Sequence, residues 1–423
     1  MPRSPQLPFY LQCLTSALMT AASSMMQVMV PLYAVSLGLG PQWLGVLIAL
    51  PGVFPVLLAL QTGRWVDRGG PGRWFFLGML GMSAGPALLT LSPGVVTLGL
   101  ARVVMGMFHL FVSVSAQSLT AGLDNGRSHT ANFAAYSTWL AGGRMVGPVL
   151  MGAILDRYGF VTSFWAVLAI LLSGTLLAYG VFRLVGSMRV DEPRDVVGSG
   201  KLLRSTLGNV GFQVAVFASA GIALALTVRE AFLPVMLEEM GISATVIGAL
   251  VSAGSLTSVL IRPLMPLVTR LLGGTARTLI VAMAAVAFGI GLLGAASSVP
   301  AFAALAVVVG FGAGIGFPLS IVAVASHVPP RQRGMALSLR LSMSLGVETV
   351  VPVLSGLLVA ATSYAVGFGA AGSVLAALTL LSWRRLPRFE AAEASAKPEP
   401  DASVEPEPDT SPAPRSPDLT SRR

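Results

Sequence analysis

Long apolar runs alternate with short polar gaps along most of the chain. Each run has about 20 residues or more, which is the length that a helix needs to cross the hydrocarbon core of a bilayer. The pattern therefore predicts an all-α integral membrane protein. Twelve membrane-spanning helices are predicted, at residues 9–37, 42–62, 74–92, 94–121, 130–155, 160–182, 211–237, 243–268, 277–297, 300–326, 334–361 and 364–383.

The longest internal polar gap divides these spans into two sets of six. We expect an N-terminal half at residues 1–183, a solvated linker at 184–208 and a C-terminal half at 209–386. Residues 387–423 are rich in Pro, Glu, Ser and Asp, which cannot build an apolar core. The last segment is therefore expected to be a disordered tail.

Composition supports the membrane assignment and excludes several other classes. Hydrophobic residues make up 54% of the 423 residues and charged residues only 11%, whereas a soluble domain has about 25% charged residues. The single cysteine, Cys13, cannot form an internal disulfide, and no Cys/His cluster predicts a metal or a cofactor. The first apolar run lacks a cleavage region and is expected to be retained as a span. The net charge of +9 comes from residues in the short gaps, so the expected partner is a lipid bilayer and not nucleic acid.

Basic residues mark one side of the predicted membrane domain. Cytoplasmic loops carry an excess of Lys and Arg, and the gaps on the other side carry only Arg157, which follows Asp156. The sequence thus predicts a multi-pass protein of the cell membrane with both termini and the linker in the cytoplasm. The basic residues that mark this side include Arg64, Arg68, Arg73, Arg127, Arg189, Arg194, Lys201, Arg204, Arg270, Arg277, Arg331, Arg333, Arg384 and Arg385.

The two halves repeat one another. Pro31, Gly38 and Gly45 recur 203 residues later as Pro234, Gly241 and Gly248, and the segment 147–152 recurs 204 residues later as 351–356. Because each half has six spans, both insert the same way up, as two pseudo-symmetric bundles about an axis along the membrane normal. A binding site is expected between them, near the middle of the membrane.

A charged, glycine-rich segment between the second and third spans carries a resemblance. Residues Gly63, Asp67, Arg68, Gly70 and Arg73 form the pattern Gly-x-x-x-Asp-Arg-x-Gly-x-x-Arg, which we expect to be a tight turn. The pattern resembles the signature loop of the major facilitator superfamily (MFS). The resemblance implies a gating role in which Asp67 faces the start of span 11 and Asp124 pairs with Arg68 or Arg73. A solvated turn that only sets topology is the alternative.

Two further motifs support the resemblance. Arg102 and Gly106 resemble the helix 4 arginine motif of the family, which is associated with proton-coupled members. The run Gly143-x-x-x-Gly147-Pro148-x-x-x-Gly152 resembles the helix 5 motif of drug/proton antiporters, with Met151 in place of the usual glycine. An Arg102 side chain that contacts a carbonyl or a buried partner within the first half is the structural alternative.

Ionisable residues inside the spans are functional candidates because a charge in hydrocarbon is costly unless it faces a cavity or a partner. Arg144 repeats as Glu348, 204 residues later, so related depths carry opposite charges. Each could also be neutralised within its own half. Glu348 is the deepest acid and suits a proton carrier, with Glu230 as the second candidate. His109 could relay a proton or simply pack. The candidates for the substrate and proton pathway are Arg102, His109, Arg144, Arg229, Glu230, Arg340, Glu348 and Gln27.

These features predict a monomeric secondary transporter that works by alternating access. We expect proton-coupled efflux of a small amphipathic organic molecule by an antiporter. Four arginines against two acids among the candidates favour an organic anion or zwitterion as the alternative substrate, taken up or exported. A transporter-like sensor that moves no substrate is a further alternative. An enzyme is not expected, because no nucleophile–base pair, metal cluster or phosphate loop stands out.

Overall fold

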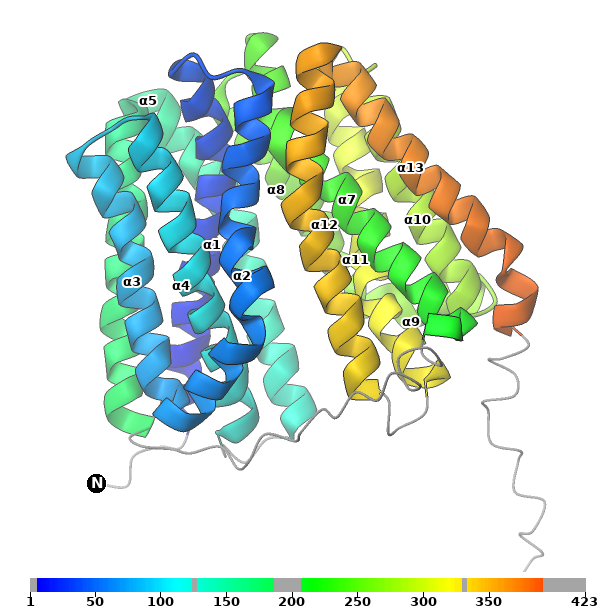
Figure 1. Ribbon diagram of the computed structural model, residues 1–423, viewed down its shortest axis with the longest axis horizontal. Coiled ribbons are helices and arrows are strands. Elements are labelled where there is room, and N and C mark those ends of the chain that lie inside the picture. Colours follow the sequence, from blue (N-terminus) through cyan, green and yellow to red (C-terminus); the bar gives the residue numbers. More distant parts are fainter. Residues whose placement is uncertain (1–5, 124–127, 186–206, 329–332, 391–423) are drawn as a thin grey trace, which may run out of the picture.

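The computed structural model describes residues 6–123, 128–185, 207–328 and 333–390, and the elements in these ranges are helices (Figure 1). In chain order they are α1 Leu7–Ser36, α2 Pro41–Gly69, α3 Pro71–Leu91, α4 Val95–Gly122, α5 His129–Val185, α7 Val210–Glu239, α8 Ala244–Leu260, the 3-10 helix η1 Arg262–Leu264, α9 Met265–Leu271, α10 Thr275–Leu293, α11 Val299–His327, α12 Arg333–Ala361 and α13 Tyr364–Arg384.

The described helices account for all twelve predicted spans. Eleven helical segments are long and apolar enough to cross a membrane. One of them, α5, runs over 57 residues and contains Gly159 with φ 74° and ψ −176°. Positive φ favours glycine, so the chain reverses there and α5 holds two spans. The eighth span is α8 followed by η1 and α9, because Pro263 and Pro266 remove backbone donors and interrupt the helix.

The helices form two bundles that lie side by side, α1–α5 and α7–α13 (Figure 1). We call the end of the molecule where α1 begins at Leu7 and α13 ends at Arg384 the terminal face, and the opposite end the distal face. In Figure 1 the ribbons of the two bundles approach each other at the distal face and diverge toward the terminal face.

Contacts inside the bundles preserve the internal repeat. A Cβ on Gly106 of α4 would collide with the backbone of Pro51 in α2, and a Cβ on Gly310 of α11 would collide with the backbone of Gly254 in α8. These pairs are related by the shifts of 203 and 204 residues found in the sequence. The repeat therefore describes equivalent helix crossings and not only similar composition.

Two predicted segments differ in the structure. The expected turn at residues 63–73 is wrong, because residues 63–69 continue α2 and the reversal is made by Gly70 alone, with φ 85°. Trp74 of α3 packs against Gly69 beside this reversal. The expected tail begins with helix, since residues 387–390 are helical and Phe389 is fully buried. The rest of the predicted tail, most of the predicted linker and Asp124 lie outside the described residues.

Candidate functional site

The two halves touch closely near the distal face, where α2 meets α12 and α5 meets α8. A Cβ on Gly45 of α2 would collide with the carbonyl of Pro352 in α12, and a Cβ on Gly248 of α8 would collide with the carbonyl of Pro148 in α5. Gly45 and Gly248 are repeat partners, as are Pro148 and Pro352. Glycine is used at these positions because the facing backbone occupies the place of a side chain.

The helix 5 motif contacts two different neighbours. Gly143 and Gly147 lie one turn apart and face α1, where a Cβ would meet the carbonyls of Ala17 and Ala21. Pro148 and Gly152 form a second such pair that faces α8, with Gly152 against Ala244. One short motif therefore joins α5 to its own half and to the other half.

A carboxylate reinforces the α5–α8 contact. Asp156 accepts hydrogen bonds from the backbone N–H groups of Ala244, at 2.9 Å, and Thr245, at 2.8 Å, and from the Thr245 hydroxyl. These amides belong to the first turn of α8, which has no intrahelical partner for them and carries a partial positive charge. Asp156 thus caps a helix of the opposite half at the distal face.

Gln27 of α1 and Glu230 of α7 meet between the halves. The Gln27 Nε2 donates to Glu230 Oε2 at 3.4 Å, and the two residues are repeat partners with a separation of 203. Two equivalent positions can touch only near the pseudo-symmetry axis, so this contact marks the centre of the molecule. Arg229 Nη2 lies 3.9 Å from Glu230 Oε1, a long ion pair between neighbouring residues.

Arg144, His109 and Glu348 border the same region. The charge of Arg144 acts on His109 of α4 and on Glu348 of α12, and the charge of Glu230 also acts on Glu348. Arg144 and Glu348 are both exposed. No ion pair within 4.0 Å joins them among the described residues. Five predicted site residues are therefore linked by one hydrogen bond and by interactions between neighbouring charges: Gln27, His109, Arg144, Glu230 and Glu348.

The other predicted arginines point into their own halves. The Arg102 Nε donates to the carbonyl of Leu47 in α2 at 3.2 Å. Arg229 is 7% exposed, and its Nη1 lies 3.1 Å from where a Cβ on Gly254 would be. Gly254 is the repeat partner of Pro51. The carbonyl of Ala306 also lies against Gly254, and Ala306 is the repeat partner of Arg102. An arginine therefore occupies the same helix crossing in both halves but comes from α4 in one and from α7 in the other.

Arg340 of α12 is likewise buried, with 8% of its surface exposed. Its Nη1 donates to the Ser320 hydroxyl of α11 at 2.9 Å, and its buried Nε has no hydrogen-bond partner within the described part of the chain. Gly63, Arg68 and Arg73 lie at the terminal face, where both arginines are exposed. The backbone of Asp67 is helical there.

Two residues near the site were not among the predicted site residues. Arg262 in η1 is exposed, and its positive charge is near enough to that of Arg144 for the two to repel. The proline that follows it could have signalled the helix interruption. Asp156 had only one signal, its position as an acid beside Arg157 in a short gap.

Comparisons with known proteins agree with this architecture. The family model described as Major Facilitator Superfamily matches residues 13–228 and 215–419. A search of curated proteins finds no match.

Three solved structures show the same fold at low identity. A bacterial homolog of the human lysosomal transporter Spinster, in an inward-facing and unoccupied conformation, has 13% identity and a TM-score of 0.74, over 95% of this chain and 100% of that chain. The peptide transporter POT in complex with sulfate has 14% identity and a TM-score of 0.74, over 91% of this chain and 95% of that chain. A variant of the nucleoside transporter NupG has 13% identity and a TM-score of 0.72, over 91% of this chain and 99% of that chain.

Proposed function

Because this chain belongs to the Major Facilitator Superfamily and is a multi-pass secondary transporter, we propose that it exports a small amphipathic organic molecule in exchange for protons. The two halves rock about the Gln27–Glu230 contact. The distal contacts at Gly45, Gly248 and Asp156 break and re-form in each cycle.

The observation that carries this proposal is the relation between Arg144 and Glu348. They are repeat partners of opposite charge on opposite halves, their charges interact, and they form no ion pair within 4.0 Å in the described structure. An acid that lacks a direct counter-ion can bind a proton, and substrate or a change in the distance to Arg144 can release it. Glu348 is therefore the proposed proton carrier and Glu230 the second acid of the pathway.

The proposed orientation places the terminal face in the cytoplasm of a cell and the protein in its plasma membrane. The support is charge: the described arginines on loops and helix ends gather at the terminal face, against Arg157 near the distal face. They are Arg64, Arg68, Arg73, Arg183, Arg270, Arg277, Arg333, Arg384, Arg385 and Arg388. In this orientation the structure is closed toward the outside.

An organic anion or zwitterion is the second candidate substrate. Arg144 and Arg262 are both exposed and lie near enough for their charges to interact, and two guanidinium groups suit a carboxylate or phosphate group. Glu348 could then hold the ammonium group of a zwitterion. This candidate differs from the first in the charge that the substrate must carry.

The test uses everted vesicles that contain the full chain and are energised by acidifying the lumen, which gives an outwardly directed proton gradient. Uptake is followed for labelled organic cations, anions and zwitterions. Gradient-driven accumulation that is lost in Glu348→Gln supports proton-coupled export, and the charge of the accumulated compound decides between the two substrate classes. Arg144→Gln should impair anions more than cations.

Two controls make the result specific. Arg157→Gln changes an exposed arginine near the distal face, and Glu239→Gln changes an acid whose Oε1 accepts from the Tyr364 hydroxyl at 2.8 Å. Both should transport normally. Accumulation that is unchanged in Glu348→Gln would reject Glu348 as the carrier, and folded protein that moves nothing in either direction would favour a transporter-like sensor.

A further inference from the structure

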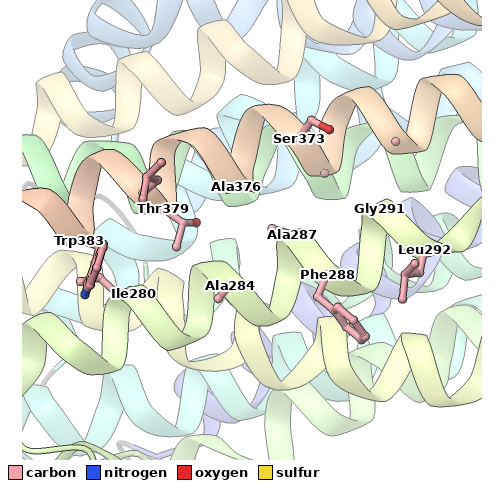
Figure 2. Close-up of a pocket in the computed structure, with 13 residues that line it drawn as sticks. Ile280, Ala284, Ala287, Phe288, Gly291, Leu292, Ser373, Ala376, Thr379 and Trp383 are labelled. Atoms are coloured by element: carbon pink, nitrogen blue, oxygen red, sulfur yellow. The ribbon is translucent and has the colours of Figure 1, made fainter.

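A groove runs between α10 and α13 on the outer side of the second half (Figure 2). Its volume is about 670 Å³. Its lining combines small residues with larger apolar side chains, and the exposed ones among the latter stand at its rim. The small lining residues are Ala284, Ala287, Gly291, Gly369, Gly372 and Ala376. In Figure 2, Ile280 and Trp383 lie near one another at one end of the groove, and Gly291 and Leu292 lie toward the other.

The internal repeat provides a comparison within the same chain. The first half pairs α3 with the second arm of α5 as the second half pairs α10 with α13. Phe164 and Phe368, 204 residues apart, are both fully buried, which supports this register. At the positions of Ala284, Gly369 and Ala376 the first half carries Leu80, Trp165 and Leu172. The sequence thus replaces large side chains with small ones where the groove lies.

The groove opens to the surroundings of the membrane domain. Its rim residues Phe288, Leu380 and Trp383 are 60%, 47% and 59% exposed. From Ile280 to Leu292 it extends about 18 Å along α10, at 1.5 Å per residue, which slightly exceeds half of the ~30 Å hydrocarbon core. The Thr379 hydroxyl in its wall already donates to the carbonyl of Leu375 at 2.7 Å. An extended apolar chain from one leaflet matches this depth and lining.

The end of the groove at the terminal face is basic. Arg277 lies three residues before Ile280, and Arg384 lies four residues after Leu380. At this spacing each arginine is on the same face of its helix as a residue that lines the groove. Arg277 pairs with Glu390 at 2.7 Å, whereas Arg384 is exposed and has no ion pair within the described ranges. Trp383 lies beside them, and tryptophan favours the membrane–water interface.

We propose that this groove binds one acyl chain of an anionic phospholipid from the leaflet at the terminal face, with the phosphate group against Arg277 and Arg384. Apolar burial holds the chain, and the two arginines select the negative head group. A second copy of the protein is the competing occupant, since small residues also allow transmembrane helices to associate.

The first test fills the groove with residues from the first half. Gly369→Trp and Ala376→Leu restore two large side chains, and a Cβ on Gly369 meets nothing within 4 Å. Gly372 is left unchanged because its Cβ would lie 2.6 Å from the Cα of Gly291. Native mass spectrometry of the full chain with phosphatidylglycerol should show a retained lipid in the wild type that is lost in the double variant. Val374→Leu, exposed on α13 but outside the groove lining, is the control and should retain it.

The second test leaves the groove itself unchanged. Arg277→Gln and Arg384→Gln should each weaken phosphatidylglycerol binding roughly fivefold, since one arginine near an anionic surface contributes ~1 kcal/mol, and should leave phosphatidylcholine binding unchanged. Equal binding of both lipids by the wild type, or retention of the lipid by the filled variant, would overturn the proposal. A wild-type dimer that the filled variant converts to a monomer would assign the groove to a second copy. If the filled variant has a lower melting temperature than the wild type, the arginine variants provide the test of the proposal instead.

Discussion

The Nε of Arg102 donates to the carbonyl of Leu47 at 3.2 Å. Leu47 lies four residues before Pro51, so its carbonyl has no intrahelical donor. In a regular helix that carbonyl would accept from the N–H of residue 51, which proline lacks. Arg102 of α4 therefore supplies the hydrogen bond that the proline removes from α2. A membrane offers no water to take its place.

Replacement of Arg102 by methionine should destabilise the protein. The Leu47 carbonyl loses its donor, and an unpaired buried carbonyl costs about 1–3 kcal/mol. In a Pro51→Ala background the N–H of residue 51 can reach the carbonyl, so the same replacement should cost less. Denaturant unfolding of the four proteins of this double-mutant cycle measures the difference.

The cycle separates structure from coupling. If Arg102 only replaces the missing donor, the Pro51→Ala, Arg102→Met protein should recover both stability and transport. If stability returns while proton-driven transport stays absent, Arg102 also acts in coupling. An equal cost of Arg102→Met in both backgrounds would show that Arg102 does not stabilise α2 by replacing the donor that Pro51 lacks.

Loss of the Asp156 carboxylate should open the distal face. Asp156→Ala removes the cap on the first turn of α8, and such caps contribute about 0.5–2 kcal/mol. The open form of the distal face should then be populated more often. This is measured as faster labelling of a cysteine introduced at Ala244, which is buried at the α5–α8 contact. Arg157→Ala is the matched control and should leave the labelling rate unchanged.

Gly248 should not tolerate a side chain, whereas Gly63 should. A valine at residue 248 collides with the carbonyl of Pro148 and should force α8 from α5, with faster distal labelling and impaired transport. A Cβ on Gly63 meets nothing within 4 Å, and alanine is favoured over glycine in a helix by about 1 kcal/mol. Gly63→Ala should therefore raise the melting temperature in this state. A stable, fully active Gly248→Val protein would show that the distal contact is dispensable.

Phe389 should anchor the end of the second half. Its ring is fully buried and lies 4.2 Å from the ring of His327, centroid to centroid. Phe389→Ala should lower the free energy of unfolding by about 3 kcal/mol, the lower part of the range for a buried phenylalanine. Arg388→Ala, at an exposed neighbour, should be neutral. Equal melting temperatures for both variants would indicate that this short helix does not stabilise the bundle.

Several features of the site follow from the sequence alone. Apolar run length and the distribution of arginines predict the spans, and the shift of 203–204 residues pairs Gln27 with Glu230 and Arg144 with Glu348. In the structure Gln27 donates to Glu230 across the halves, whereas Arg144 and Glu348 form no ion pair within 4.0 Å among the described residues. Repeat partners share a depth, so the pairing could be read before any helix was placed.

The orientation of individual side chains could not be read in this way. Arg229 and Glu230 are adjacent, yet one is buried against Gly254 in its own half and the other meets Gln27 across the halves. Hydropathy reports burial only as an average over a span, because lipid and protein neighbours are both apolar.

The sequence by itself determined that the chain crosses a membrane twelve times in two equivalent halves, since span length and repetition are local properties of the chain. The tertiary structure decided that Arg102 satisfies Leu47, that Asp156 caps α8, and that the helix 5 motif divides its contacts between α1 and α8. These choices depend on which helix lies opposite each face. The arrangement of the helices is set by packing between residues that lie about 50 to 120 positions apart in these cases. Close approach of the backbones and the need to pair buried carbonyls determine which helices contact one another.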